Sequence, residues 1–394
     1  MTSASPRVAG IALGYGALAG AVAGATYLLM GALEHLIWSV SQDWWYIPVV
    51  VMAGGLILVG LRPHLDGEGL DAQLAQAADP THLRRRRTAA LAAAAIVAVA
   101  CGGAIGPEAG LIAVVAELSA IVSHAIARNH AEERLIGQAG SAAALAGLYG
   151  SPPGAAAYDD DALTPPKALP FLAGVAGFVA FVATVRTRDH SAGGVVLPSY
   201  APSSVMDLVW AIAPAAVAAL AAYGYVRGRP FLAAGLARVG SPRLQTLVGS
   251  LLFAGLVTAW PLLRFSGHGD FDQVVNYAEA SAWGLLAALA AFKLLACALC
   301  VSSGWLGGEF FPLMLSGAAA GAATLVAVPE LAATAAIAAG IGAATAVGLR
   351  KPLAALLIGA LILGGVALGP LLVGVAAGVM VLWVLPMPSA TRAH

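Results

Sequence analysis

One stretch decides the fold of this chain, Gly103-Ala-Ile-Gly-Pro-Glu-Ala-Gly110, because a relative of it recurs as Gly304-Trp-Leu-Gly-Gly-Glu-Phe-Phe-Pro312. Aligned without gaps, the two copies share three positions: Gly103 with Gly304, Gly106 with Gly307, and Glu108 with Glu309. The sequence therefore consists of two related halves, and each half has a glycine-broken apolar segment that carries one carboxylate. In membrane proteins this pattern indicates an ion or substrate site between two repeats, built from broken helices.

The composition is that of a membrane protein. Of the 394 residues, 60% are apolar and 10% are charged, and the mean hydropathy is +0.86. A soluble chain carries about a quarter charged residues. Long apolar stretches that can cross a bilayer as helices follow one another closely: Ile11–Leu33, Ile47–Leu61, Ala89–Ala104, Phe171–Val185, Val205–Val226, Thr246–Leu263, Trp283–Val301 and Leu353–Leu385. Shorter segments, Gly140–Gly150 and Leu331–Gly348, favour helices that stop partway across. We predict an all-α polytopic membrane protein.

Several other classes of protein are disfavoured. The net charge of zero leaves no electrostatic footprint for a nucleic acid. The three cysteines lie in or beside apolar segments with no histidine nearby, so we expect neither a metal nor a redox site, and no cofactor. We find no pairing of a nucleophile with a base that would indicate an enzyme, and we do not expect one. We expect no cleavable signal peptide and place Arg84–Arg87 on the cytoplasmic side. One membrane domain is expected over residues 1–394, with halves at about 10–190 and 205–385.

The first copy predicts a gate. Glu108 lies between two apolar helices, where a carboxylate is costly and usually functional. Gly106 and Pro107 suit a helix start, and a helix start attracts anions through its free N–H groups, here with Ala109 in the first turn. Glu108 would then be a tethered anion in an anion site, which opens when the carboxylate is protonated or displaced. The alternative is a glutamate that caps its own helix near the surface.

The second copy predicts the opposite wall of the same site. Gly308 lets the backbone approach an ion closely, and the N–H groups of Glu309, Phe310 and Phe311 could point at it. The phenylalanine rings would exclude water. The sequence leaves open whether the Glu309 side chain faces away, so that only its N–H group serves the site.

These segments resemble the CLC chloride channel and transporter family. Leu299–Met314 is similar to the segment in which that family has GxxGGxFxP, and Gly106–Gly110 resembles its GxEGP segment, which carries the gating glutamate. The resemblance extends to two helix starts, Gly150–Pro153 and Arg350–Leu353, and covers about Gly10 to Leu385. It implies two inverted repeats of broken and tilted helices. It also implies a homodimer with an anion pathway in each subunit, embedded in lipid in the inner or plasma membrane.

The chain departs from the family at the first anion-site motif, GSGIP. The segment in its place is Pro63–Leu70. Gly67, Glu68 and Gly69 match the glycines but place a glutamate where the family has serine. A register with His64 or Leu65 at the site, and a plain polar cytoplasmic loop, are the alternatives.

Two further departures concern the cytoplasmic side. No tyrosine occurs at 365–368, where the resemblance places an inner tyrosine. The expected inner proton-passing glutamate is replaced by a run of acids, Asp159, Asp160 and Asp161. This run is either a proton path or a solvated helix end, so anion conduction is better supported than proton coupling.

The sequence therefore predicts transport of small inorganic anions, with chloride as the default. The alternatives are fluoride or another anion with proton coupling, a non-conducting protein of the same fold, and a cation or metabolite carrier that uses Glu68, Glu108 and Glu309. The faces that we expect to meet in the dimer are those around Phe171–Val185 and Trp283–Ala296. Lys293, within the second face, needs a partner or a polar lining.

Overall fold

The computed structural model describes residues 6–41, 43–65, 70–77, 85–186, 197–201 and 205–387. The predicted all-α fold is confirmed, since the described residues form helices joined by short turns and one isolated β-bridge. The first half contains α1 (Pro6–Trp38), α2 (Tyr46–Leu61), α3 (Leu70–Ala77), α4 (Arg85–Ala100), α5 (Glu108–Ile126), α6 (His130–Tyr149), α7 (Pro152–Ala157) and α8 (Ala168–Arg186). The second contains α9 (Met206–Trp210), α10 (Ile212–Ala237), α11 (Pro242–Ala259), α12 (Phe271–Glu279), α13 (Trp283–Ser303), α14 (Phe310–Ala323), α15 (Ala333–Leu349), α16 (Pro352–Ile362) and α17 (Leu368–Val384).

Within the described residues, six helices are long and apolar enough to cross a membrane. They are Pro6–Trp38, Tyr46–His64, Glu108–Ile126, Ala168–Arg186, Met206–Ala237 and Trp283–Ser303. Helices of this length match the thickness of the hydrocarbon core. The protein is an integral membrane protein, and the shorter apolar helices pack among these spans.

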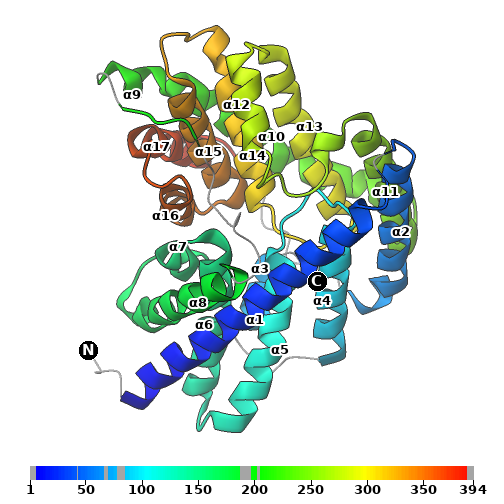
Figure 1. Ribbon diagram of the computed structural model, residues 1–394, viewed down its shortest axis with the longest axis vertical. Helices are drawn as coiled ribbons and strands as arrows, with labels where there is room; N and C mark the ends of the chain where they lie inside the picture. Colours follow the sequence, from blue (N-terminus) through cyan, green and yellow to red (C-terminus); the bar gives the residue numbers. More distant parts are fainter. Residues whose placement is uncertain are drawn as a thin grey trace.

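The two halves share one packing scheme. The long helix α1 contacts α4, α5, α6 and α8, and α10 makes the corresponding contacts with α13, α14, α15 and α17. Two pairs join the halves: α2 lies beside α11, and α7 lies beside α16 (Figure 1). The repeat inferred from the glycine motifs is therefore also seen in the helices that pack against α1 and α10. The predicted boundary near residue 190 lies outside the described residues.

The segment Gly140–Gly150 forms the end of the longer helix α6, which has 20 residues. One expectation about helix breaks was wrong. The run Leu353–Leu385 is not a single span: it is divided into α16 and α17 at Gly364 and Gly365, whose φ angles are 59° and 73°. Glycine adopts these angles readily, and other residues do so at a cost. The segment Leu331–Gly348 does form a short helix, the 17-residue α15.

Close helix contact depends on small residues. A Cβ atom added at Gly16 or Gly20 of α1 would meet the backbone of Ala173 or Gly177 on α8. Membrane helices associate through such backbone approach, because the apolar surroundings give little hydrophobic drive between helices. The close contact between α1 and α8 therefore holds these two helices together beside α6, which carries part of the site.

Lys293 of α13 finds the polar partners that the sequence required. Its ammonium group is fully buried and donates to the carbonyl oxygens of Leu263, Arg264 and Phe265, at 3.3, 3.0 and 2.9 Å. Three acceptors match the three N–H donors of a lysine, which offsets the cost of burying the charge. On the predicted dimer faces, Val179 of α8 and Phe292 of α13 are exposed.

Candidate anion site

The two glycine motifs meet where α5 and α14 begin. The N–H group of Gly106 donates to the Gly308 carbonyl at 2.8 Å, and that of Gly308 donates to the Gly106 carbonyl at 3.0 Å. Each preceding helix ends at a glycine in the left-handed region, Gly102 with φ 86° and Gly304 with φ 90°. These glycines let the chain reverse tightly, so that two helix N-termini are held next to each other.

Glycine at both bridge positions leaves room for the Glu108 side chain. A Cβ atom added at Gly106 or at Gly308 would collide with the Glu108 carboxylate. The carboxylate therefore lies against the bridge and contacts both copies of the motif. The structure thus brings Gly106, Glu108 and Gly308 of the two halves together, as the sequence predicted.

Glu108 is the first residue of α5, and its side chain is completely buried. The hydroxyl group of Tyr149 donates to its Oε1 atom at 3.2 Å, whereas its Oε2 atom has no hydrogen-bond partner. A buried carboxylate with one unpaired oxygen is costly. The first-turn N–H groups of α5 and α14 have no acceptor within their own helix, and the dipoles of both helices favour negative charge there. The site is therefore suited to an anionic group, and Glu108 supplies one.

Aromatic rings pack around Tyr149, the residue whose hydroxyl group contacts the carboxylate. The ring of Tyr149 lies 4.7 Å from that of Phe310, 5.9 Å from that of Phe311 and 5.8 Å from that of Tyr158, measured between centroids. Phe310 is fully buried and Phe311 nearly so. Rings packed this closely leave little room for water, and low dielectric strengthens every charge interaction inside. The dry wall expected from the two phenylalanines is present, with tyrosines added to it.

Glu309 takes a different direction from Glu108, although the two occupy equivalent positions of the repeat. Its carboxylate accepts a hydrogen bond from the Tyr225 hydroxyl at 2.6 Å and forms an ion pair with Arg229. Both partners belong to α10, whereas Glu108 contacts α6. Only the backbone of Glu309, as the N-cap of α14, is turned toward the bridge.

Glu309→Gln is expected to leave anion flux largely intact. The amide keeps an oxygen for Tyr225 and loses only the charge that pairs with the half-exposed Arg229, so stability should fall by about 1 kcal/mol or less. The measurement is flux per folded protein in liposomes, with the unfolding midpoint beside it. Arg229→Gln is the matched variant, because it removes the other half of the pair. A loss of flux in Glu309→Gln that Arg229→Gln does not share would place the carboxylate in the pathway.

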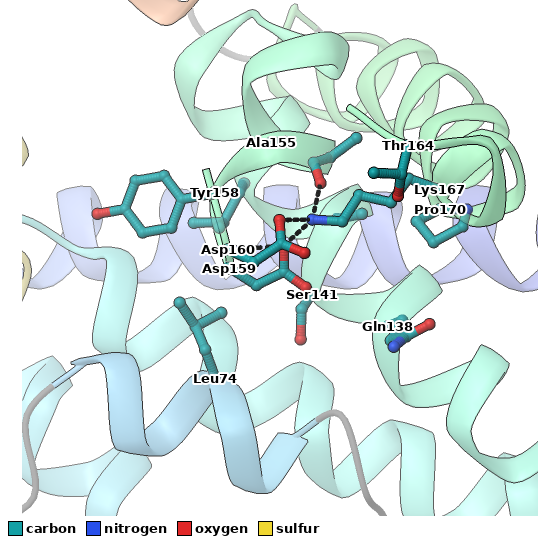
Figure 2. Close-up of a pocket in the computed structure, with 13 residues that line it drawn as sticks. Leu74, Gln138, Ser141, Ala155, Tyr158, Asp159, Asp160, Thr164, Lys167 and Pro170 are labelled. Carbon is teal, nitrogen blue, oxygen red and sulfur yellow. Dashed lines mark hydrogen bonds and ion pairs between the residues drawn. The ribbon is translucent and has the colours of Figure 1, made fainter. Parts of the chain in front are cut away.

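A cavity of ≈ 240 Å³ lies beside Tyr158 and is lined mainly by residues of α3, α6, α7 and α8. Figure 2 shows the Lys167 ammonium between the carboxylates of Asp159 and Asp160, and the Tyr158 hydroxyl pointing away from it. Partial burial opposes ionisation of Asp160, but its hydrogen bond and ion pair with Lys167 outweigh this and lower the pKa of Asp160 below its usual value. These two acids are therefore already paired with a cation.

Asp161 has a separate role in the fold. Its carboxylate accepts the N–H groups of Leu353 at 3.1 Å and Ala354 at 2.8 Å, which caps the start of α16. Unpaired N–H groups at a helix start favour such a cap. Of the predicted proton-path residues, two line the cavity and the third ties the two halves together.

The other predicted site residues are placed as follows. Pro107 is the N-cap of α5, and Ala109 is buried in its first turn. Gly67, Glu68 and Gly69 lie outside the described residues; of the alternatives nearby, His64 is exposed and Leu65 is buried. Sequence reasoning missed Tyr149, although it is the one aromatic residue in the small-residue run that precedes Gly150. It also missed Tyr225 and Arg229, whose spacing of four places both on one face of α10.

Comparisons with known proteins find similar sequences and structures over most of the chain. The profile of a family described as voltage gated chloride channel matches residues 49–382. Relatives named ion-transport protein YfeO, from Escherichia coli strain SMS-3-5 and from Shigella flexneri, are each 26% identical over 313 residues, covering 74% of this chain and 73% of theirs.

Solved structures share the fold. A slow cyanobacterial Cl⁻/H⁺ antiporter matches with a TM-score of 0.77 at 18% identity, over 96% of both chains. A CLC-type fluoride/proton antiporter matches with a TM-score of 0.74 at 17% identity, over 95% of both chains. At these identities the likeness concerns the fold.

Proposed function

This chain belongs to the voltage gated chloride channel family, and from that membership we propose that it moves small inorganic anions across a membrane, with chloride as its substrate. One observation carries the proposal: the buried Glu108 carboxylate lies against the glycine bridge where two helix N-termini meet. A site that holds a carboxylate in this way offers the same N–H groups and dipoles to a free anion.

Glu108 is the gate in this proposal. In the structure its carboxylate fills the space beside Gly106 and Gly308, so an anion cannot occupy that space at the same time. Protonation removes the charge that the helix N-termini attract, and a competing anion then replaces the side chain. Flux should therefore rise as the pH falls.

The charges of the site support an anion as the cargo. A carrier of cations or metabolites would need acidic side chains along the path in both halves. Of the acids that such a path would use, Glu309 is paired with Arg229, Glu108 lies where two helix N-termini favour negative charge, and Glu68 lies outside the described residues. The surroundings of Glu108 and Glu309 therefore suit an anion better than a cation.

A second candidate is fluoride or another anion, moved with proton coupling. It is favoured by the cavity that Asp159 and Asp160 line beside Tyr158, since acids there could supply protons toward the site. The same fold occurs in a chloride/proton antiporter and in a fluoride/proton antiporter. The two candidates differ in cargo and in proton movement, and one assay separates them.

The test is flux from liposomes that contain only this protein. Chloride efflux down its gradient is expected once a potassium ionophore allows charge to balance, and liposomes without protein are the control. Two parallel experiments test the second candidate. One measures efflux of fluoride in place of chloride, and the other follows proton movement with a pH electrode. Absence of flux for every anion would show a non-conducting protein of this fold. Potassium flux without ionophore and without anion movement would favour the cation carrier.

We infer that the protein works as a homodimer in the cell membrane, with one pathway in each subunit. The exposed apolar side chains of α8 and α13, among them Val179 and Phe292, support an interface formed by these helices. Homo-oligomers most often adopt two-fold symmetry. Each subunit has its own Glu108 site made only from its own helices, so no residue has to come from a partner.

A further inference from the structure

We propose that the Tyr149 hydroxyl group is a ligand of the transported anion and that it sets the affinity of the site. This inference rests on the proposed function, because it identifies a side chain that would contact the cargo. It adds a donor from α6 to the backbone groups of α5 and α14, so three helices would hold the ion.

The argument starts from the place that the carboxylate occupies. Glu108 Oε1 accepts the Tyr149 O–H group at 3.2 Å, and within the described residues this is the one side-chain hydrogen bond that the carboxylate receives. The carboxylate stands in for the anion. When it leaves, the hydroxyl group keeps its position and loses its charged acceptor, with the neutral Tyr158 hydroxyl group as its remaining neighbour. A hydrogen bond to a charged group is stronger than one between neutral groups, so an entering anion gains by accepting the Tyr149 hydroxyl group.

The surroundings of Tyr149 hold its hydroxyl group in place. The residue is 1% exposed, and its ring is packed between Phe310, Phe311 and Tyr158. It ends α6 just before Gly150, a left-handed C-cap with φ 63° that turns the chain away. A ring fixed in this way cannot turn its hydroxyl group toward water. The donor is therefore preorganised for whichever anionic group occupies the site.

A rival role for Tyr149 is that of a latch, which holds the carboxylate closed and never contacts the cargo. The two roles differ once the carboxylate charge is removed. In a Glu108→Gln background a latch has no anion to hold, so its hydroxyl group should no longer matter. A ligand should still matter, because the free anion continues to use the hydroxyl group.

The experiment combines Tyr149→Phe with both forms of residue 108. Phenylalanine keeps the ring and removes only the donor. The apparent KM for chloride should rise by about tenfold in the Glu108→Gln background, as expected for loss of a hydrogen bond to a charged group. Tyr15→Phe is the matched control, because Tyr15 is also buried and its hydroxyl group shares a hydrogen bond of 2.6 Å with the hydroxyl group of Ser119, away from Glu108 in the chain and with no contact to it among the hydrogen bonds that Glu108 forms with the described residues. An unchanged KM in the double variant would leave Tyr149 as a latch and overturn the proposal.

A second readout avoids dependence on flux. Chloride that binds the folded protein raises its unfolding midpoint, and Tyr149→Phe should need about tenfold more chloride for the same rise. An equal chloride response in Tyr149→Phe and Tyr15→Phe would contradict the proposal. Failure of the proposed function looks different: the unmodified protein would then show neither anion flux nor stabilisation by chloride.

Discussion

Glu108→Gln is expected to make anion flux nearly independent of pH and fast at neutral pH. In the unmodified protein the neutral fraction of a carboxyl group changes about tenfold per pH unit above its pKa, so flux should rise steeply as the pH falls. Glutamine has the shape of the protonated side chain and carries no charge. It therefore does not compete with the anion for the N-termini of α5 and α14. The measurement is the initial rate of efflux from liposomes between about pH 4 and pH 7.

Glu330→Gln is the matched control, because Glu330 is an exposed carboxylate in the turn before α15. It should keep the full pH dependence of the unmodified protein. If Glu108→Gln also keeps it, the gate is another group and the assignment of Glu108 fails. If both variants lose it, the pH dependence arises from surface charge.

A covalently linked dimer extends the same variant to the assembly. With Glu108→Gln in one half, one pathway should be independent of pH and the other should keep its pH dependence. The total flux should then be the sum of a constant and a pH-dependent part. A uniform change of all flux would instead show that both subunits share one pore.

The sequence predicted the contact between the two glycine motifs better than it predicted the helix ends. Glycine and glutamate spacing grouped Gly106, Glu108 and Gly308, because glycines at such positions favour close backbone approach. The break between α16 and α17 was not predicted, because the residues around Gly364 are as apolar as the helices. Lipid is apolar as well, so hydrophobic patterning in a membrane protein carries little information about where helices end or which way they face.

Tyr149 shows the same limit at the level of a single side chain. Its place in the site depends on how α6 is rotated against α5. That rotation is set by contacts such as Gly140 against Ser119, where an added Cβ would lie 2.8 Å from the serine Oγ atom. Such contacts leave no periodic pattern of residues in the sequence, so they cannot be predicted from it. The opposite direction of Glu309 was likewise left open by the repeat, because Arg229 lies 80 residues away in the chain.

Gly308→Val is expected to lower anion flux by about 100-fold, comparable to the loss when a preorganised site is displaced by about 1 Å. The first carbon of any side chain at this position would overlap the Glu108 carboxylate, and valine adds two more carbons that cannot rotate freely. The carboxylate would have to move aside, and the valine side chain would then occupy the space that an anion needs in the proposed site. The bridge to Gly106 would open, and the N-termini of α5 and α14 would separate.

Gly224→Val provides the control, because it makes the same substitution inside α10, where an added Cβ has nothing within 4 Å. Both variants replace glycine by valine, but the new side chain meets open space at position 224 and the Glu108 carboxylate at position 308. Flux per folded protein, with the unfolding midpoint measured on the same samples, separates a blocked site from a misfolded one. Gly224→Val should conduct as the unmodified protein does. If Gly308→Val conducts equally well, the contact of the two glycine motifs is packing alone, and the anion must cross the protein elsewhere.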